Sequence, residues 1–306
     1  MSDSFGSPVP NFLIVGAAKA GTTSLYYYLG QHPEIGFPKL KEPKYFSSLD
    51  LKFPHYGPGD STVDQYAVKD FQEYQALFRN LTHYKMIGEA SPDYLFYYEH
   101  SIKNIMNTLG DVHIIIVLRE PIQRAFSAYS YLVRDNRENL SFVDALNEED
   151  KRIRMNWDFS WHYKKAGLYF EQVEKFLSSF SNVKVVLLDE IINDKNAVLC
   201  DLYNFLGVST SFQADLSAEY NPSGVPNNPI TKFLLNRQSN LSVWIRETLK
   251  RFVPRSILEL IARKTLVKVS ITEDELRFLD DYFCDDIENL EKLLDKDLST
   301  WKRSNF

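Results

Sequence analysis

The stretch VGAAKAGTTS, from Val15 to Ser24, decides the fold because it places a glycine-rich loop between a strand and a helix. Gly16 and Gly21 have the separation of a Walker A loop, but the lysine lies inside the loop at position 19. Thr22 stands where that lysine would be expected. The stretch predicts an anion-binding turn whose ligand differs from a nucleoside triphosphate, although a glycine-rich turn without a ligand is the alternative.

Four β-branched runs alternate with helical segments along the chain. Such an alternation predicts an α/β fold with a mainly parallel central sheet flanked by helices, of the P-loop nucleotide-binding type, and a helical C-terminal part. Residues 48–64 are rich in turn-forming residues, and we expect an irregular loop there. The predicted buried strands are Phe12–Val15, Lys85–Ile87, Val112–Leu118 and Val183–Leu188.

Composition narrows the class of protein. The 306 residues carry a net charge of -6, which argues against a nucleic-acid partner. The N-terminus has no basic segment followed by an apolar run, and no apolar run approaches the roughly 18 residues of a membrane span. Cys200 and Cys284 form no metal-binding or disulfide pattern. We therefore expect a cytoplasmic protein without a transmembrane segment.

A second anion site follows the third predicted strand, in IIIVLREPIQRAFSAYSYL (114–132). A magnesium nucleotide site needs an acidic residue at a strand end, whereas this strand ends in Arg119, which suits bidentate phosphate binding. Ser127 follows eight residues later in the next helix. The ligand is expected to carry two phosphate groups, one at the loop and one at Arg119 and Ser127, and no metal is implied.

These two motifs resemble those of the sulfotransferase family that uses 3′-phosphoadenosine 5′-phosphosulfate (PAPS), in the style of its bacterial and heparan-sulfate-type members. The resemblance implies that the loop binds the 5′-phosphosulfate and that Arg119 and Ser127 bind the 3′-phosphate. YNPSGVPNN (220–228) resembles the family's late nucleotide-contacting loop. The cofactor-binding residues implied are Lys19, Ala20, Gly21, Thr22, Thr23, Ser24, Arg119, Ser127, Ser223 and Gly224.

The resemblance covers most of the chain. It implies a single sulfotransferase domain over 1–306, with a nucleotide-binding α/β core at 10–210. Residues 211–306 would then supply the late loop and the C-terminal helices. The acceptor pocket is expected to come from loops such as 37–64 and 151–166 and from those helices.

Sulfuryl transfer needs positive charge where the leaving phosphate oxygen becomes negative, and a base for the acceptor proton. Lys19 suits the first task. Glu42, in KEPKYF (41–46), resembles the catalytic glutamate of heparan-type members, and we expect partial burial to raise its pKa. The alternatives are a Glu42 paired with Lys41 or Lys44 at the surface, and a histidine base, for which His162 is the main candidate.

Two positions depart from the family pattern. Ala90 stands where heparan-type members have a lysine, which makes a polyanionic acceptor less favoured than a neutral one. Asn227 stands where a basic residue is common. The acceptor is expected to offer a hydroxyl, less readily an amine, on a glycan, a lipid-linked molecule or a small natural product. A P-loop nucleotide or sugar kinase using Mg-ATP is the alternative enzyme, and a non-catalytic nucleotide-binding module is a third hypothesis.

Overall fold

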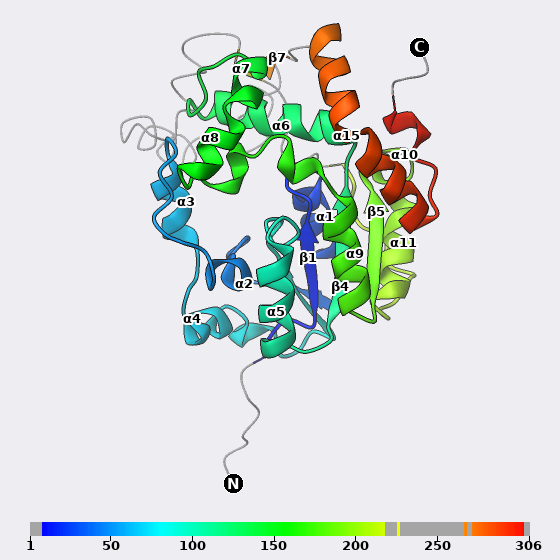
Figure 1. Cartoon of the computed structure of the whole chain (residues 1–306). Coiled ribbons are helices and arrows are strands. Elements are labelled where there is room, and N and C mark those ends of the chain that lie inside the picture. Colours follow the sequence, from blue (N-terminus) through cyan, green and yellow to red (C-terminus); the bar gives the residue numbers. More distant parts are fainter. Residues whose placement is uncertain (1–7, 218–224, 227–265, 268–270, 303–306) are drawn as a thin grey trace.

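A five-stranded sheet forms the centre of the computed structural model, which describes residues 8–217, 225–226, 266–267 and 271–302 (Figure 1). All neighbouring strands of this sheet pair in parallel, in the order β2-β3-β1-β4-β5. This confirms the predicted mainly parallel sheet. The strands are β1 (Phe12–Gly16), β2 (Ile35–Gly36), β3 (Met86–Ala90), β4 (His113–Leu118) and β5 (Val183–Leu187); β6 (Val225–Pro226) and β7 (Leu266–Val267) pair separately, antiparallel.

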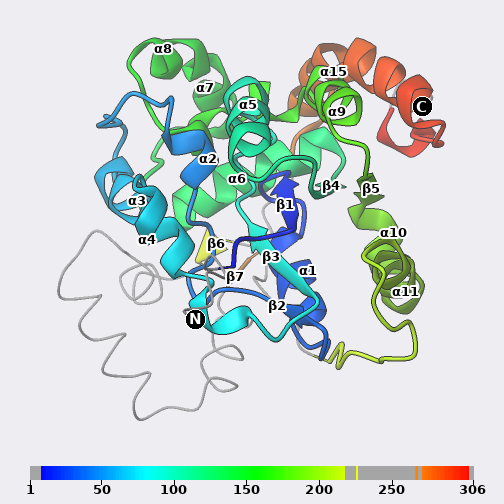
Figure 2. The ribbon, with the colours of Figure 1, turned by 90° about the horizontal axis from the view of Figure 1, so that it is seen from below.

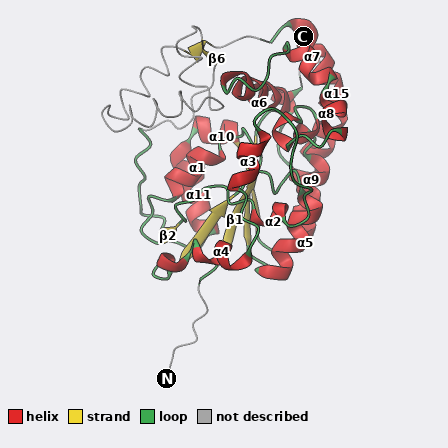
Figure 3. Cartoon of the chain, turned by 90° about the vertical axis from the view of Figure 1, so that its left-hand side faces the viewer, coloured by secondary structure: helices red, strands yellow, loops and turns green. Residues whose placement is uncertain are grey.

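Helices cover both faces of the sheet, with α1 and α11 on one side and α5 and α9 on the other (Figures 2 and 3). The shorter helices α2, α3 and α4 lie together beside the sheet (Figure 1). The helices are α1 (Thr22–Leu29), α2 (Tyr45–Ser48), α3 (Asp60–Tyr66), α4 (Phe71–Ala76), α5 (Tyr98–Thr108), α6 (Pro121–Arg134), α7 (Phe142–Asn147), α8 (Glu149–Arg154), α9 (Phe170–Ser179), α10 (Leu188–Asn193), α11 (Lys195–Phe205) and α15 (Glu273–Leu294). Short 3-10 turns occur at Arg79–Leu81, Phe159–Trp161, Lys165–Gly167 and Ser299–Trp301.

The central strands are buried on both faces, which explains their unbroken apolar sequence. Residues Phe12 to Val15 of β1 and Ile114 to Leu118 of β4 are fully buried. A parallel sheet covered by helices on both sides requires such strands. The carboxyl ends of β1, β3 and β4 consequently meet at one edge of the sheet.

Local signals set the helix ends as the sequence predicts. α1 ends before Gly30, and α6 begins with Pro121 in its first turn. The Glu120 carboxylate caps α6 by accepting hydrogen bonds from the backbone N–H groups of Ile122 at 2.9 Å and Gln123 at 2.8 Å. This cap fixes the chain direction directly after Arg119.

The expectation of an irregular loop over 48–64 was wrong in part, because residues from Asp60 onward form α3. The Asp60 side chain is fully buried and accepts hydrogen bonds from Gly57 N at 2.8 Å and Trp161 Nε1 at 3.0 Å. It also forms an ion pair with Arg137. Trp161 and Arg137 are distant in sequence from Asp60, so local composition could not reveal the helix. The short strand β2 was likewise not predicted.

The C-terminal helix α15 packs against α9, as its amphipathic sequence implies. The Asp286 carboxylate accepts hydrogen bonds from the backbone N–H groups of Tyr169 at 2.7 Å and Phe170 at 3.1 Å, at the start of α9. Among the described residues, no helix combines the length and apolar character needed to cross a membrane. The division of the chain at residue 210 stays a prediction.

Candidate active site

The loop after β1 turns sharply to start α1. Lys19 and Gly21 both have left-handed backbone conformations, with φ of 70° and 94°. A side chain at Gly21 would be strained, and its Cβ would lie 2.8 Å from Leu188 Cδ1. The Ala17 N–H donates to the Val117 carbonyl of β4 at 2.6 Å, which holds the loop against the neighbouring strand. The positive φ and the close approach of Leu188 therefore require glycine at position 21.

The N-terminus of α1 has the features of an anion-binding site. Gly21 offers no side-chain cap, and the first turn contains no acidic residue. The first N–H groups of a helix have no partner within the helix, and the helix dipole adds positive potential there. Thr23 and Ser24 are half-buried in this turn, whereas Thr22 is buried. The backbone N–H groups at residues 21–24 thus suit a phosphate group, whereas the N–H of Ala20 donates to the Ala17 carbonyl at 3.2 Å.

Lys19 lies at the centre of the candidate site. Its Nζ is 4.3 Å from the centre of the Tyr131 ring on α6. Burial lowers the pKa of Lys19 to about 7, with Arg134 and Arg119 adding to the shift and Glu42 and Asp135 opposing it. An anion bound beside this amine would favour its charged form. Lys19 is therefore poised to gain a proton when a phosphate binds.

Arg119 reaches the loop from the end of β4. Its Nη1 donates a hydrogen bond to the Lys19 carbonyl at 3.3 Å. Its own carbonyl accepts a hydrogen bond from the Tyr169 hydroxyl at 3.0 Å. Burial lowers the pKa of Arg119, but a guanidinium keeps its proton in proteins. Ser127 lies on α6, half-buried and about two turns into the helix.

Glu42 lies on the segment between β2 and α2, which runs along the end of β3. Its backbone N–H donates to the Ala90 carbonyl at 3.2 Å, and Lys44 N–H donates to Ser91 Oγ at 3.0 Å. The Glu42 carboxylate forms an ion pair with Lys41 and is 37% exposed. The pairing with a neighbouring lysine that the sequence left open is therefore present, and the base role stays a prediction.

The expected rise in the pKa of Glu42 was wrong. Burial pushes this pKa upward, but the ammonium groups of Lys41, Lys44 and Lys19 outweigh it, so the pKa lies below its usual value. The segment KEPK places Lys41 directly before Glu42 and Lys44 two positions after it, and the fold adds Lys19. Glu42 is accordingly an ionised carboxylate at neutral pH.

Buried acidic residues behind the site were not predicted. Glu89, the residue before Ala90, is fully buried and accepts hydrogen bonds on Oε2 from Tyr94 at 2.8 Å and Tyr74 at 3.3 Å. Burial raises the pKa of Glu89 to about 7. Asp93, three residues after Ala90, is also buried. The sequence GEASPDY contains both, but only tertiary contacts reveal their environment.

Two buried histidines, His162 and His32, are poor candidates for the base. His162 is buried, and burial lowers its pKa to about 4. His32 is buried as well, with Nδ1 accepting from Glu34 N at 3.1 Å and Nε2 lying 2.9 Å from the Ser209 carbonyl. Both ring nitrogens of His32 thus serve structural contacts. The candidates Ser223 and Gly224, and the departure at Asn227, lie outside the described residues.

The chain belongs to the sulfotransferase family, whose family model matches residues 10–212. A crystal structure of a sulfotransferase from Alicyclobacillus acidocaldarius is 36% identical, with a TM-score of 0.77, and the match covers 97% of this chain and 100% of that one. The family membership favours the sulfotransferase hypothesis over the kinase alternative.

Curated relatives include the membrane-associated sulfotransferase kil1 of Dictyostelium discoideum, 32% identical over 55% of this chain and 34% of that protein. Human carbohydrate sulfotransferase 15 is 27% identical over 46% of this chain and 30% of its own length. The matches thus span about a third of these relatives.

Proposed function

We propose that the protein transfers a sulfuryl group from PAPS to an acceptor hydroxyl, less readily an amine, by in-line displacement. The observation that carries this proposal is the hydrogen bond from Arg119 to the Lys19 carbonyl, since it joins the two anion sites at one edge of the sheet. A nucleotide that carries one phosphate group at the 5′ position of its sugar and another at the 3′ position fits two such sites. The donor would supply an activated sulfuryl group.

The residues present fit that donor. Residues 21–24 would offer backbone N–H groups and hydroxyls to the 5′ end, because no side chain caps the start of α1. The N–H of Ala20, also expected to bind the nucleotide, already donates to the Ala17 carbonyl at 3.2 Å. Arg119 and Ser127 would hold the 3′-phosphate. Arg134 adds a third positive charge near Lys19, as its lowering of the Lys19 pKa indicates. Ser223 and Gly224 remain proposed contacts of the nucleotide.

Lys19 would stabilise the negative charge that develops on the leaving phosphate oxygen. Its single flexible ammonium can follow that charge, which a planar guanidinium does less easily. Glu42 would take the proton of the acceptor hydroxyl. An ionised carboxylate that is 37% exposed is in the correct form for a base, although its lowered pKa limits its strength.

The acceptor is proposed to be a glycan, a lipid-linked molecule or a small natural product. The name of the carbohydrate sulfotransferase among the relatives supports a carbohydrate. A cytoplasmic location is likewise a proposal that rests on the sequence.

A thermal-shift comparison tests the donor. 3′-Phosphoadenosine 5′-phosphate (PAP) at about 100 times its dissociation constant should add about 2.7 kcal/mol of stability, whereas ATP with Mg²⁺ should add much less. A larger shift with ATP and Mg²⁺ would contradict the proposal. Transfer of radiolabel from [³⁵S]PAPS to a panel of sugars, lipids and phenols then tests the reaction itself.

A further inference from the structure

An aromatic ring on α6 lies against the Lys19 ammonium. Lys19 Nζ is 4.3 Å from the centre of the Tyr131 ring, and the central guanidinium carbon of Arg134 is 5.0 Å from the same point. The face of a tyrosine ring is electron-rich and attracts a cation that lies within about 6 Å of the ring centre. Tyr131 is therefore placed to stabilise positive charge beside the glycine-rich loop.

The sequence of α6 explains why this ring reaches the loop. Tyr131 follows Ser127 by four positions and Arg134 follows Tyr131 by three, so the three side chains lie on one face of the helix. The Glu120 cap fixes the start of that helix at the end of β4, the strand next to β1. The helix face that carries the proposed phosphate contact Ser127 thus also brings Tyr131 to Lys19.

Lys19 has little other support for its charge. The charged groups that shift its pKa lie on the segment before α2, at the end of β4 and on α6: Glu42, Arg119, Arg134 and Asp135. The two carboxylates among them are engaged with other cations, since Glu42 pairs with Lys41 and Asp135 Oδ1 lies 3.9 Å from Arg134 Nε. Within the described part of the chain, the Lys19 ammonium forms neither a hydrogen bond nor an ion pair, and the Tyr131 ring is the contact that fixes its position.

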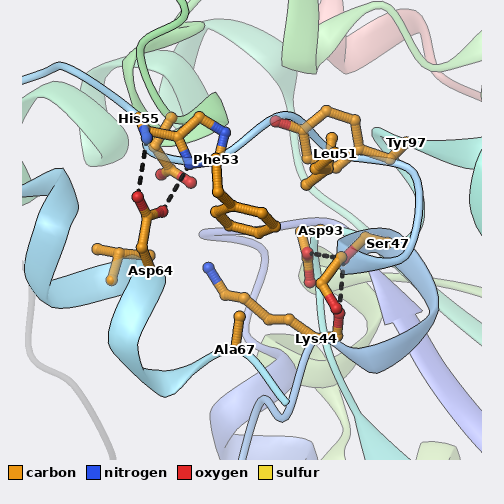
Figure 4. A pocket seen from close by; sticks show the side chains of 12 residues that line it. Lys44, Ser47, Leu51, Phe53, His55, Asp64, Ala67, Asp93 and Tyr97 are labelled. Atoms are coloured by element: carbon orange, nitrogen blue, oxygen red, sulfur yellow. Dashed lines mark hydrogen bonds and ion pairs between the residues drawn. The ribbon is translucent and has the colours of Figure 1, made fainter. Parts of the chain in front are cut away.

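The other lysine close to the site has aromatic neighbours of its own. Figure 4 shows the Lys44 side chain extending beneath the Phe53 ring. Its Nζ lies 5.4 Å from the centre of the Phe159 ring. A substitution of Tyr131 should therefore act chiefly on Lys19.

We propose that Tyr131 is a positioning residue for Lys19: its ring holds the ammonium beside the glycine-rich loop and favours the charged form of the amine. The charged form is the one that can bind a phosphate oxygen and stabilise negative charge on it. The inference rests on the proposed function for its meaning in catalysis, whereas the contact itself can be tested in the donor-free protein.

Lysine NMR of the donor-free protein tests the contact directly. In the full chain labelled with [6-¹³C]lysine, the Cε signal of Lys19 reports the protonation of the amine, and its loss in Lys19→Arg identifies it. Tyr131→Leu removes the ring face, so the midpoint of the Lys19 titration should fall by about one pH unit. Tyr131→Phe keeps the ring face and should leave the midpoint within about 0.3 pH units of the parent.

A replacement of matched shape separates the electrostatics of the ring from its packing. Pentafluorophenylalanine in place of Tyr131 keeps nearly the size of phenylalanine, but its fluorines withdraw electrons and reverse the charge of the ring face. The Lys19 midpoint should then fall at least as far as in Tyr131→Leu. A ring that only fills space would give the same midpoint for phenylalanine and for its fluorinated form.

PAP affinity connects this contact to the donor site. If binding requires the charged amine, a fall of one unit from a pKa of about 7 weakens binding about 2-fold at pH 6 and about 9-fold at pH 8. A packing defect in Tyr131→Leu would instead weaken binding equally at both pH values. Isothermal titration calorimetry at the two pH values measures the ratio.

Tyr129→Leu is the matched control, because it removes another tyrosine from the same helix. The Tyr129 hydroxyl donates to the Leu140 carbonyl at 2.9 Å, and its ring packs 5.1 Å from the Phe142 ring on α7. This variant should leave the Lys19 midpoint and the pH dependence of PAP affinity unchanged.

The outcomes separate this inference from the proposed function. An unchanged or raised Lys19 midpoint in Tyr131→Leu, or equal midpoints for phenylalanine and its fluorinated form, would overturn the role of Tyr131 whether or not PAP binds. Failure of PAP to bind the parent protein would overturn the proposed function and leave the NMR test of Tyr131 in force.

Discussion

The Arg119 guanidinium donates a hydrogen bond to the backbone carbonyl of Lys19 at 3.3 Å, across 100 positions of the chain. The contact exists because β1 and β4 are neighbouring parallel strands, so the residues that follow them emerge at the same edge. Arg119 thereby supports the glycine-rich loop after β1, in addition to its proposed role in binding the second phosphate group. Substitutions in one motif should for this reason affect the other.

Arg119→Ala should weaken PAP binding. A hydrogen bond to a charged group contributes about 1.5–3 kcal/mol, which corresponds to roughly 10- to 150-fold in the dissociation constant. Isothermal titration calorimetry with PAP measures the change. Ser127→Ala removes one neutral hydroxyl and should cost less, about 1 kcal/mol. An unchanged PAP affinity in Arg119→Ala would remove this residue from the nucleotide site.

PAP binding should depend on pH through Lys19. The pKa of this amine is about 7 in the free protein, because burial and nearby arginines oppose its charge. A bound phosphate favours the charged form, so binding takes up a proton above pH 7 and affinity falls as the pH rises toward 9. Titrations at pH 8 in two buffers of different ionisation enthalpy measure that uptake. Lys19→Arg stays charged and should lose the uptake, and an equal uptake in both proteins would contradict the assignment.

Glu42→Gln should abolish most turnover while leaving PAP affinity within a few-fold of the parent. Removing a general base typically costs about 10²–10⁴ in rate. Glu99→Gln, an exposed substitution on α5, serves as the control for a lost carboxylate and should keep its activity. Single-turnover measurements with [³⁵S]PAPS distinguish slow chemistry from slow product release. Full activity in Glu42→Gln would exclude this carboxylate as the base.

The buried Glu89 should make the protein less stable as the pH rises. Its pKa is about 7 in the folded protein against an ordinary 4.5, because burial disfavours the charge. The folded state therefore holds the proton more tightly, and this contribution is complete below pH 4.5 and lost as the pH rises through 7, by at most about 3 kcal/mol. Urea denaturation of Glu89→Gln between pH 5 and 8 should show a smaller decrease than the parent. Parallel pH profiles would show that Glu89 is ionised in the fold.

The sequence predicts much of the fold because the strong local patterns and the tertiary structure agree. The apolar runs of β1 and β4 are buried on both faces, and Pro121 and Gly30 mark helix ends. Helix α3 was missed since its start depends on Asp60, whose partners Trp161 and Arg137 are distant in sequence. Hydrogen bonds between residues distant in sequence produce no periodic pattern in the sequence from which such a helix could be predicted.

The parts of the candidate site that belong to sequence motifs next to strands could be predicted from the sequence. Lys19 and Arg119 were expected to share one ligand, and the structure brings them into contact. The pKa values of Glu42 and Glu89 depend instead on which groups fold around them, namely lysines in the first case and an apolar interior in the second. Predicting the pKa of a buried carboxylate therefore requires the three-dimensional structure, because burial and nearby charges act in opposite directions.

The carboxylate of Asp286 on α15 holds the first amides of α9, and Tyr169 in that same turn donates its hydroxyl to the Arg119 carbonyl. A relay of contacts consequently runs from the last long helix through one tyrosine to the arginine and on to the glycine-rich loop. Truncated variants that end before residue 271 would lose Asp286 and with it this chain of contacts, so we expect them to bind the proposed nucleotide more weakly.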